Sequence, residues 1–377
     1  MKPLPRSSFP KTISVLKQYA GLNVAVPSDF VGMHMHRWPT GNPVSADPGD
    51  LAYGHIRTHD NGSYPVGVTW RSINTAQGVY DWSGLDALIS AHEARGASII
   101  YTVYGTPAWA ATATGQTHQD AYGQFGGADK PAQIAHLSTF ITALVTRYGA
   151  RIKYIEIWNE PGFTQDWSGF FWGSAIDLVA MGNAIYTAAK AVNPGVIILS
   201  PGFSGNGNVS AFLNAQDPVS GKYGYQVFDH FAFHPYGHTY LGQLFGADIE
   251  LGGSQSIITT RALLDANSCS GKEMYITEWG VSGWLEPVLL TQADASFRRK
   301  LISRTLATAA ILKVKGFSVY SYDHTNKLAG DYVNDIDGVR AGLKDVAVNL
   351  AGKTILSAII YNDGSIKITT NVGDVVF

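Results

Sequence analysis

The segment KYIEIWNEP (residues 153–161) joins the pattern of a buried β-strand to a polar end. Most of its first residues are β-branched or aromatic, which is typical of a strand inside a sheet. Asn159, Glu160 and Pro161 follow directly. Because proline has no backbone N–H for a strand ladder, we expect the sheet to end here and the Glu160 side chain to project past it.

Seven further segments repeat this strand pattern, and helical patterns separate most of them. The predicted strands are residues 30–36, 53–60, 97–105, 153–160, 196–202, 228–236, 273–280 and 316–324. The predicted helices include 83–96, with Ser83 as its N-cap, 132–149, ending at Gly149, 293–316, ending at Gly316, and 338–352. Eight strand–helix units predict an α/β fold, the (β/α)8 TIM barrel. A doubly wound sheet is disfavoured because no Gly-x-Gly-x-x-Gly turn follows the first strand.

The end of the sequence changes character. TILSAIIYNDGSIKITTNVGDVVF (354–377) alternates polar and apolar residues around an Asn-Asp-Gly-Ser turn, which predicts a β-hairpin. No low-complexity linker precedes it. We therefore expect a catalytic barrel over residues 1–352 and a short hairpin extension over residues 353–377, packed on the barrel as a small C-terminal β appendage.

Composition excludes several classes of function. The 27 Lys and Arg residues against 29 Asp and Glu residues give a net charge of −2, so the chain lacks the basic field that nucleic acid or an anionic membrane attracts. Cys269 is the single cysteine, which rules out an internal disulfide and a zinc cluster of cysteines. No apolar run suits a membrane span, and the first twenty residues lack a signal-peptide pattern. Oligomeric state and localisation stay open.

The predicted strands carry polar residues at their C-terminal ends, where TIM barrels build their active sites. These residues are His34, His36, Arg57, His59, Asp60, Asn159, Glu160, His234, Tyr236, Glu278, Tyr320, Tyr322 and Asp323. Glu160 and Glu278 end the fourth and seventh strands, so they face each other across the barrel mouth. A carboxylic acid opposite a carboxylate is the pair that glycosidic bond hydrolysis needs. Glu156 lies deeper, about 13 Å below Glu160 at the rise of a strand, which predicts a buried structural acid.

Three motifs carry a family resemblance. IEIWNEP (155–161), YITEWG (275–280) and FAFHPYG (231–237) resemble the motifs of clan A retaining glycoside hydrolases. WRSINTAQGVYDWSGLDALI (70–89) further resembles members of families 39 and 5. The resemblance implies double displacement, with Glu160 as the general acid/base, Glu278 as the nucleophile and no metal or cofactor. It also implies a polysaccharide or oligosaccharide substrate, which is an extracellular type of substrate.

The same resemblance implies roles for neighbouring residues. Asn159 would bind the 2-hydroxyl of the sugar, while Arg57 and Tyr236 would hold Glu278 ionised. The remaining substrate-binding candidates are His36, His234, Tyr320, Trp109 and Trp284. Tyr320 stands near the end of the eighth strand, where the clan usually has tryptophan.

Tryptophans in the predicted loops suggest how long the substrate is. Trp38, Trp109, Trp172 and Trp284 follow strands one, three, four and seven, where an indole face can stack on a sugar ring. Several such platforms favour an endo-acting enzyme on a β-linked polysaccharide or exopolysaccharide.

Two alternatives belong to other classes. His34, His36, His234 and Asp323 could hold zinc in a metal-dependent amidohydrolase barrel, although Glu278 would then have no role. The chain could instead be a catalytically inactive glycan-binding protein, against which both glutamates argue.

Overall fold

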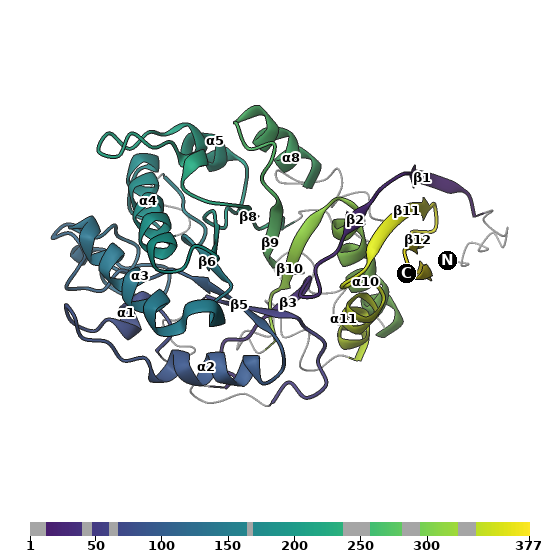
Figure 1. Ribbon diagram of the computed structural model, residues 1–377, viewed down its shortest axis with the longest axis horizontal. Helices are drawn as coiled ribbons and strands as arrows, with labels where there is room; N and C mark the ends of the chain where they lie inside the picture. The colour runs from purple at the N-terminus through teal and green to yellow at the C-terminus, as the bar shows by residue number, and fades with distance from the viewer. Residues whose placement is uncertain are drawn as a thin grey trace, which may run out of the picture.

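A computed structural model describes residues 13–39, 47–59, 67–163, 169–236, 257–280, 295–322 and 337–377. Figure 1 shows a parallel sheet surrounded by helices, with a second sheet beside it. The parallel strands are β3 Val31–His34, β4 His55–Thr58, β5 Ser98–Thr102, β6 Tyr154–Glu156, β7 Ile197–Leu199, β8 Phe231–Phe233, β9 Met274–Trp279 and β10 Val314–Val319. Their order is β7-β6-β5-β4-β3-β10-β9-β8. Seven of the predicted strand segments contain one of these strands, and the eighth, 316–324, overlaps β10, which begins two residues earlier at Val314.

The two outer strands of this sheet, β7 and β8, approach each other. Isolated parallel bridges join Leu199 to His230 and Phe203 to Phe233. The backbone N–H of Ser200 also donates to the carbonyl of His230 at 2.9 Å. The sheet is therefore a nearly closed barrel, which confirms the predicted TIM-barrel class.

Helices cover the outside of the barrel. They are α1 Trp70–Ile73, α2 Ser83–Glu93, α3 Ile134–Tyr148, α4 Ala175–Val192, α5 Gly207–Asn214, α8 Ile257–Ala266, α10 Ala295–Ile311 and α11 Asp337–Asn349, with short 3-10 turns at Gly115–Thr117, Gly149–Arg151 and Gly224–Gln226. No helix within the described ranges is long and apolar enough to cross a membrane.

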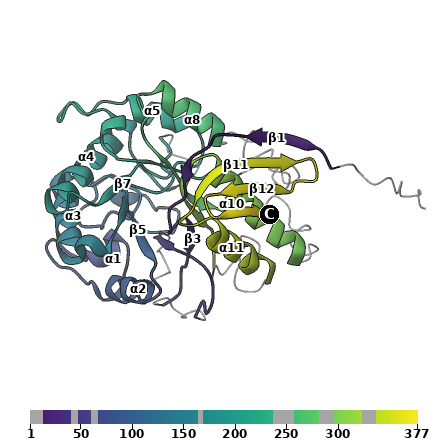
Figure 2. The ribbon, with the colours of Figure 1, turned by 45° about the vertical axis from the view of Figure 1, so that its right-hand side comes forward.

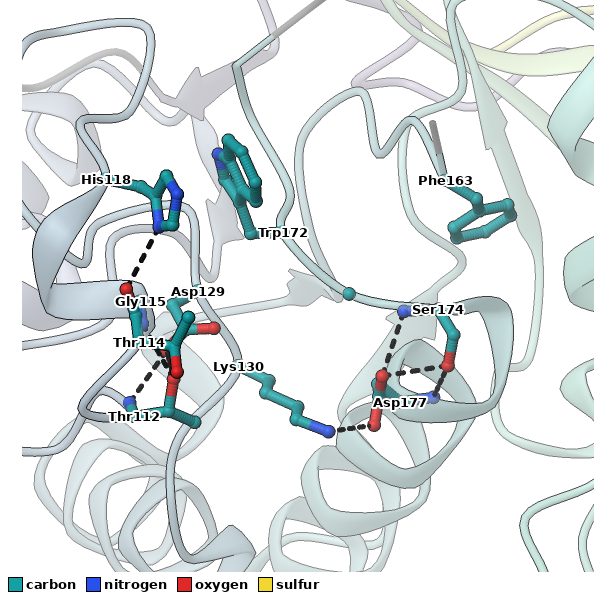
Figure 3. A pocket seen from close by; sticks show the side chains of 11 residues that line it. Thr112, Thr114, Gly115, His118, Asp129, Lys130, Phe163, Trp172, Ser174 and Asp177 are labelled. Atoms are coloured by element: carbon teal, nitrogen blue, oxygen red, sulfur yellow. Dashed lines mark hydrogen bonds and ion pairs between the residues drawn. The ribbon is translucent and has the colours of Figure 1, made fainter. Parts of the chain in front are cut away.

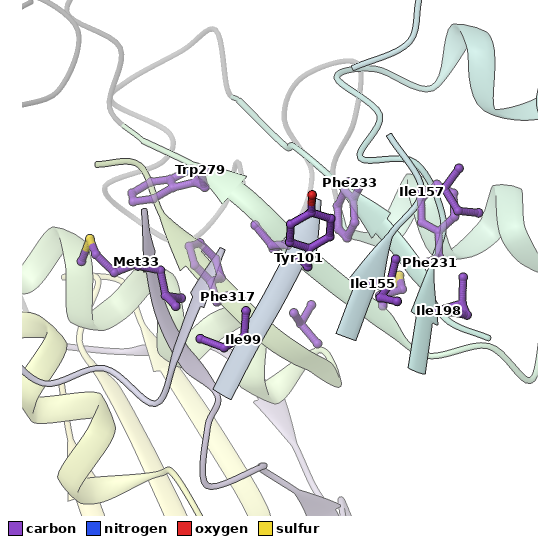
Figure 4. Packing of buried hydrophobic residues seen from close by; sticks show 14 of the residues in the cluster. Met33, Ile99, Tyr101, Ile155, Ile157, Ile198, Phe231, Phe233, Trp279 and Phe317 are labelled. Atoms are coloured by element: carbon purple, nitrogen blue, oxygen red, sulfur yellow. The ribbon is translucent and has the colours of Figure 1, made fainter. Parts of the chain in front are cut away.

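Strand residues are buried on both sides of the sheet, which explains their nearly continuous apolar runs. Outward side chains such as Ile99, Ile155 and Phe317 join the main core between sheet and helices (Figure 4). Inward side chains, including Tyr154 and Tyr275, form a smaller cluster within the barrel. The alternation therefore sends every second residue toward the barrel axis, on which the site is built.

Three predicted helix ends can be compared with the structure. Gly149 follows α3 with a φ of 54°, a left-handed conformation suited to glycine, as predicted. Ser83 is not the cap of α2: Trp82 takes the N-cap position, and the Ser83 hydroxyl bonds Asp81 instead. The last predicted helix before β10 does not reach Gly316, because Lys313 turns the chain with a φ of 67° and β10 begins at Val314.

The C-terminal residues form an antiparallel sheet, seen beside the barrel in Figure 2. The predicted hairpin is β11 Thr354–Tyr361 with β12 Ile366–Thr370, and β13 Gly373–Val376 adds a third strand. Two strands from the start of the chain, β1 Val15–Tyr19 and β2 Val24–Ala25, both pair with β11. The fold is thus a barrel with a C-terminal β appendage that also includes N-terminal strands. A boundary at residue 352 stays a prediction.

Candidate active site

Glu160 and Glu278 meet at the C-terminal mouth of the barrel. Glu278 lies in β9, and Glu160 follows β6, where its backbone N–H donates to the carbonyl of Gly202 at 2.8 Å. Glu160 has a φ of 38°, which residues other than glycine seldom adopt and which is found at functional sites. One oxygen of each carboxylate and a nitrogen of His234 all lie within 4.8 Å of one another. The two carboxylates therefore face one small space.

Both oxygens of Glu278 accept hydrogen bonds from buried donors. The Tyr236 hydroxyl donates to Oε1 at 2.8 Å, and Arg57 Nη1 donates to Oε2 at 3.0 Å. Burial, together with the charge of Glu278, raises the pKa of Tyr236 well above its usual value, so the hydroxyl keeps its proton. His59 Nδ1 also lies near this carboxylate, 3.8 Å from Oε2. These contacts fix the orientation of the carboxylate.

Arg57 lies at the centre of a buried polar network beneath the two glutamates. Its side chain is fully buried, and its Nε donates to Glu156 Oε2 at 2.7 Å. Thr102 donates to the same oxygen at 2.8 Å. Glu156 is thus the buried, hydrogen-bonded acid that its depth in the strand predicted. A buried guanidinium paired in this way is stable, whereas removal of one partner would leave an uncompensated charge.

Asn159 is held by the same arginine. Arg57 Nη2 donates to Asn159 Oδ1 at 2.8 Å, and the residue is almost completely buried. Its Nδ2 has no hydrogen-bond partner among the described residues. Buried amide donors are nearly always paired, so the unpartnered Nδ2 of Asn159 is an exception within this network.

His234 connects the two glutamates through a ring that is neutral near pH 7. Its Nδ1 lies 2.7 Å from Glu160 Oε1, and its Nε2 lies 3.1 Å from Thr277 Oγ1. Burial lowers the pKa of His234 to about 4. The Glu160 contact is therefore a hydrogen bond of neutral imidazole, whose direction depends on which partner carries the proton.

His36 and Tyr320 lie together beside this network. The Tyr320 ring is 5.1 Å, centroid to centroid, from both His34 and His36. His34 donates through Nε2 to the carbonyl of Thr277 at 2.9 Å, an assignment that follows because a carbonyl can only accept. His36 is buried. Within this cluster of rings, a nitrogen of His34 lies within 4.8 Å of an oxygen of Glu278.

Two tryptophans, Trp109 and Trp284, were predicted to bind substrate. Trp109 is half-buried, its Nε1 donates to the carbonyl of Asn74 at 2.8 Å, and its ring contacts His136. These contacts direct it toward α1 and α3. Trp284 lies outside the described residues.

Sequence reasoning did not single out Thr277. The Thr277 hydroxyl lies 3.1 Å from His234 Nε2, and its carbonyl accepts a hydrogen bond from His34 Nε2, so Thr277 in β9 links residues at the ends of β8 and β3. A charged residue such as Glu278 is unusual in a buried strand and so indicates a site, whereas a threonine is common in strands and indicates nothing by itself. Only the position directly before Glu278 could have suggested that Thr277 lies close to the site.

Among the described residues, two groups of side chains have potential metal-ligand atoms within 4.8 Å of one another: His34, His59 and Glu278, and Glu160, His234 and Glu278. Both include Glu278, whose two oxygens already bond Arg57 and Tyr236. Arg57 Nη1 also lies 3.3 Å from His34 Nε2. This guanidinium supplies the positive charge that a cation would bring, so the residues fit a metal poorly. Asp323, a ligand of the zinc alternative, lies outside the described residues.

No known family pattern matches the sequence, and no curated protein matches it. Solved structures do match the fold. A glycoside hydrolase family 39 β-xylosidase from Caulobacter crescentus has a TM-score of 0.59 at 17% identity, over 92% of this chain and 76% of that protein. A family 44 xyloglucanase from Paenibacillus polymyxa has a TM-score of 0.61 at 14% identity, over 94% and 84%. A glucosidase from Croceicoccus marinus has a TM-score of 0.58 at 15% identity, over 94% and 76%. This chain therefore shares the fold of enzymes that cleave glycosides.

Proposed function

We propose that this protein is a retaining glycoside hydrolase of clan A, with Glu278 as the nucleophile and Glu160 as the general acid/base. The main support is the short gap between their oxygens, within 4.8 Å. Retaining enzymes hold their carboxyl groups about 5–5.5 Å apart, whereas inverting enzymes need about 6.5–9.5 Å to admit a water molecule. The gap here belongs to the shorter class.

The reaction proceeds in two displacements. Glu278 attacks the anomeric carbon while Glu160 gives its proton to the departing glycosidic oxygen, which leaves a glycosyl ester on Glu278 and a free sugar hydroxyl. Glu160, now ionised, then takes a proton from water, and the water oxygen replaces Glu278 at the same carbon. Two inversions return the original configuration. Arg57 and Tyr236 orient the attacking carboxylate and donate hydrogen bonds to the charge that returns to it when it leaves the sugar.

His234 suits both half-reactions because it stays neutral. When Glu160 is protonated, its hydroxyl can donate to His234 Nδ1, and the Nε2–H donates to Thr277 Oγ1. When Glu160 is ionised, the other tautomer donates from Nδ1 to Glu160, and its Nε2 accepts a hydrogen bond from the Thr277 hydroxyl. The threonine hydroxyl can reverse its role, so the pair follows Glu160 without adding charge.

The substrate we propose is a β-linked polysaccharide, cleaved internally. The structural neighbours include a β-xylosidase and a xyloglucanase. The unpartnered Nδ2 of Asn159 is the donor for the 2-hydroxyl of the sugar at the cleavage point, a bond that strengthens as charge develops on the ring. We place this sugar beside Tyr320, whose ring lies 5.1 Å from that of the buried His36.

The test of catalytic roles uses charge-removing variants. Glu160→Gln and Glu278→Gln should each lower turnover of xylan, xyloglucan or β-glucan by several orders of magnitude, because glutamine keeps the volume but can neither attack nor exchange the proton. Glu273→Gln, at the opposite end of β9, makes the same change at an exposed residue and should keep full activity. A near-normal rate in either of the first two variants would refute its assigned role.

Azide rescue separates the two roles. In Glu278→Ala, azide takes the place of the nucleophile and should give the inverted glycosyl azide; in Glu160→Ala, it attacks the glycosyl-enzyme and should give the retained one. Proton NMR of the first product of the wild-type enzyme should show the original anomer. An inverted anomer would exclude double displacement. If the wild type binds glycans but cleaves none, the protein is a glycan-binding protein instead.

A further inference from the structure

A cavity opens at the same end of the barrel as the two glutamates. Its volume is about 670 Å³, and it lies between the segment that follows β5 and the segment that follows β6. Pockets of about 300–1,000 Å³ hold small-molecule ligands, so one or two sugar rings fit this space. Sequence reasoning proposed Trp172 as a sugar platform, and this residue lines the cavity.

Aromatic side chains stand on two sides of the cavity. His118 stacks on the Trp172 indole with ring centroids 4.1 Å apart and planes at 27°. Figure 3 shows His118 on one side of Trp172 and Phe163 across the cavity from it. The backbone N–H of Trp172 donates to the carbonyl of Ala128 at 2.7 Å, which fixes the indole relative to the other segment. Aromatic faces on a rigid support are the surfaces on which sugar rings stack.

The charged groups of the cavity neutralise one another. Lys130 Nζ donates to Asp177 Oδ1 at 2.5 Å. Asp177 also accepts hydrogen bonds from the backbone N–H and the hydroxyl of Ser174. Ser174 is the N-cap of α4, and the two residues form a capping box at the start of this helix. The Asp177 carboxylate thus already occupies the two groups that would attract an anionic ligand, the Lys130 ammonium and the N-terminus of α4. The lining favours a neutral ligand.

Asp129 provides a hydrogen-bonding group suited to hydroxyls. Its Oδ2 accepts from the backbone of Thr112 at 2.7 Å and from the Thr112 hydroxyl at 2.6 Å. The carboxylate is buried and packs against Gly115, where an added Cβ would lie 1.8 Å from Oδ2. In Figure 3 the other oxygen of Asp129 points toward the cavity. An aromatic platform beside an oriented carboxylate is a combination that binds a neutral sugar.

The cavity lies on the Glu160 side of the active site. Glu160, Phe163 and Trp172 all belong to the segment that follows β6, and Phe171 links them by packing against both Trp158 and Phe163. Glu278 stands on β9, across the barrel mouth. The acid/base protonates the leaving oxygen, so the departing part of the substrate extends on its side of the site.

We propose that this cavity is a distal subsite that binds a neutral sugar unit on the leaving-group side of the substrate. The inference rests on the proposed function, because the roles of Glu160 and Glu278 define which side that is. The subsite gives binding energy only to chains long enough to reach it, which makes this enzyme selective for oligosaccharides and polysaccharides over disaccharides.

Calorimetric binding to the full chain carrying Glu278→Gln tests this subsite without turnover. The probes are xylohexaose and cellohexaose, each compared with its disaccharide. Introducing Trp172→Ala into the Glu278→Gln protein should weaken its affinity for the recognised hexasaccharide at least tenfold and should change its affinity for the disaccharide much less. Phe163→Ala, on the opposite wall, should act in the same direction, and Trp172→Phe should restore most of the affinity because it keeps an aromatic face.

Phe125→Ala is the matched control. Phe125 is an exposed aromatic residue in the segment that follows β5, outside the cavity lining, and its removal should leave both affinities unchanged. Equal losses for hexasaccharide and disaccharide, or no loss in Trp172→Ala, overturn the subsite and leave the proposed catalysis intact. If the Glu278→Gln protein binds none of these sugars while the wild type cleaves none, the proposed function fails together with the subsite.

Discussion

Tyr236 shows how a single hydroxyl contributes to this site. Its bond to Glu278 Oε1, at 2.8 Å, comes from a group that keeps its proton because burial raises its pKa. Tyr236→Phe removes this donor and little volume. Because a hydrogen bond to a charged group contributes about 1.5–3 kcal/mol, we expect kcat to fall about 10- to 100-fold. Tyr53→Phe, which removes a hydroxyl bonded to His92, should leave kcat unchanged, and steady-state kinetics on the best polysaccharide substrate compares them.

At this scale the sequence predicts residues whose positions follow from one strand alone. Glu160 and Glu278 could be placed at the mouth, and Glu156 below it, from the rise and alternation of a strand. The partners of Arg57 could not be assigned in the same way without the family resemblance. Its contacts to Glu156 and Asn159 depend on how strands β4 and β6 are staggered across the barrel, and no local pattern encodes that stagger.

The turn after β7 is an element whose shape the site requires. A Cβ on Gly202 would lie 2.5 Å from His234 Nε2 and 2.9 Å from Glu156 Oε1. Gly202→Ala should therefore displace both groups, lower kcat at least tenfold and destabilise the fold by about 1–3 kcal/mol. Gly207→Ala, in α5, meets no atom within 4 Å and should change stability by less than about 1 kcal/mol. Thermal unfolding and turnover, measured together, check the pair; equal behaviour would contradict the close fit.

Elements were predicted well where they carry long apolar runs. The eight barrel strands are buried on both faces, so their sequences stand out from the polar loops. The boundary between α10 and β10 was misplaced because Ala-rich helix and strand run together through ILKVKG, and Lys313 rather than a glycine makes the turn. β1 and β2 were not predicted: β2 is two residues long, and β1 is mostly exposed.

For the whole molecule, buried histidines set the response to acid. Burial lowers the pKa of His34 and His55, that of His92 to about 3 and that of His234 to about 4. In the unfolded chain these histidines bind protons near pH 6.5, whereas in the folded chain they bind them only at lower pH. The free energy of unfolding is therefore unaffected by these histidines above pH 6.5. It falls as the pH drops toward 4, by up to about 1.4 kcal/mol per pH unit for each histidine.

Urea unfolding at pH 7, 6, 5 and 4 measures this fall. His92 Nδ1 lies 3.1 Å from the Tyr53 hydroxyl, and after burial the charge of Arg95 is the next cause that lowers the pKa of His92. His92→Gln keeps an acceptor but cannot titrate, so it should make the dependence shallower by one histidine. An unchanged slope in this variant would show that His92 is protonated equally in both states.

The pairing of β1 with β11 also constrains how the chain can fold during synthesis. Gln18 pairs with Ile359 and Tyr19 with Ala358, so β1 cannot find its partner until nearly the whole barrel has been translated. Contacts this distant in sequence form late and slowly. β1 also remains the outer strand of this sheet, and Val15 and Leu16 are exposed on it in the folded protein, so this edge can pair with a second chain. The second sheet thus joins segments from before and after the barrel strands, and we expect it to form after the barrel itself.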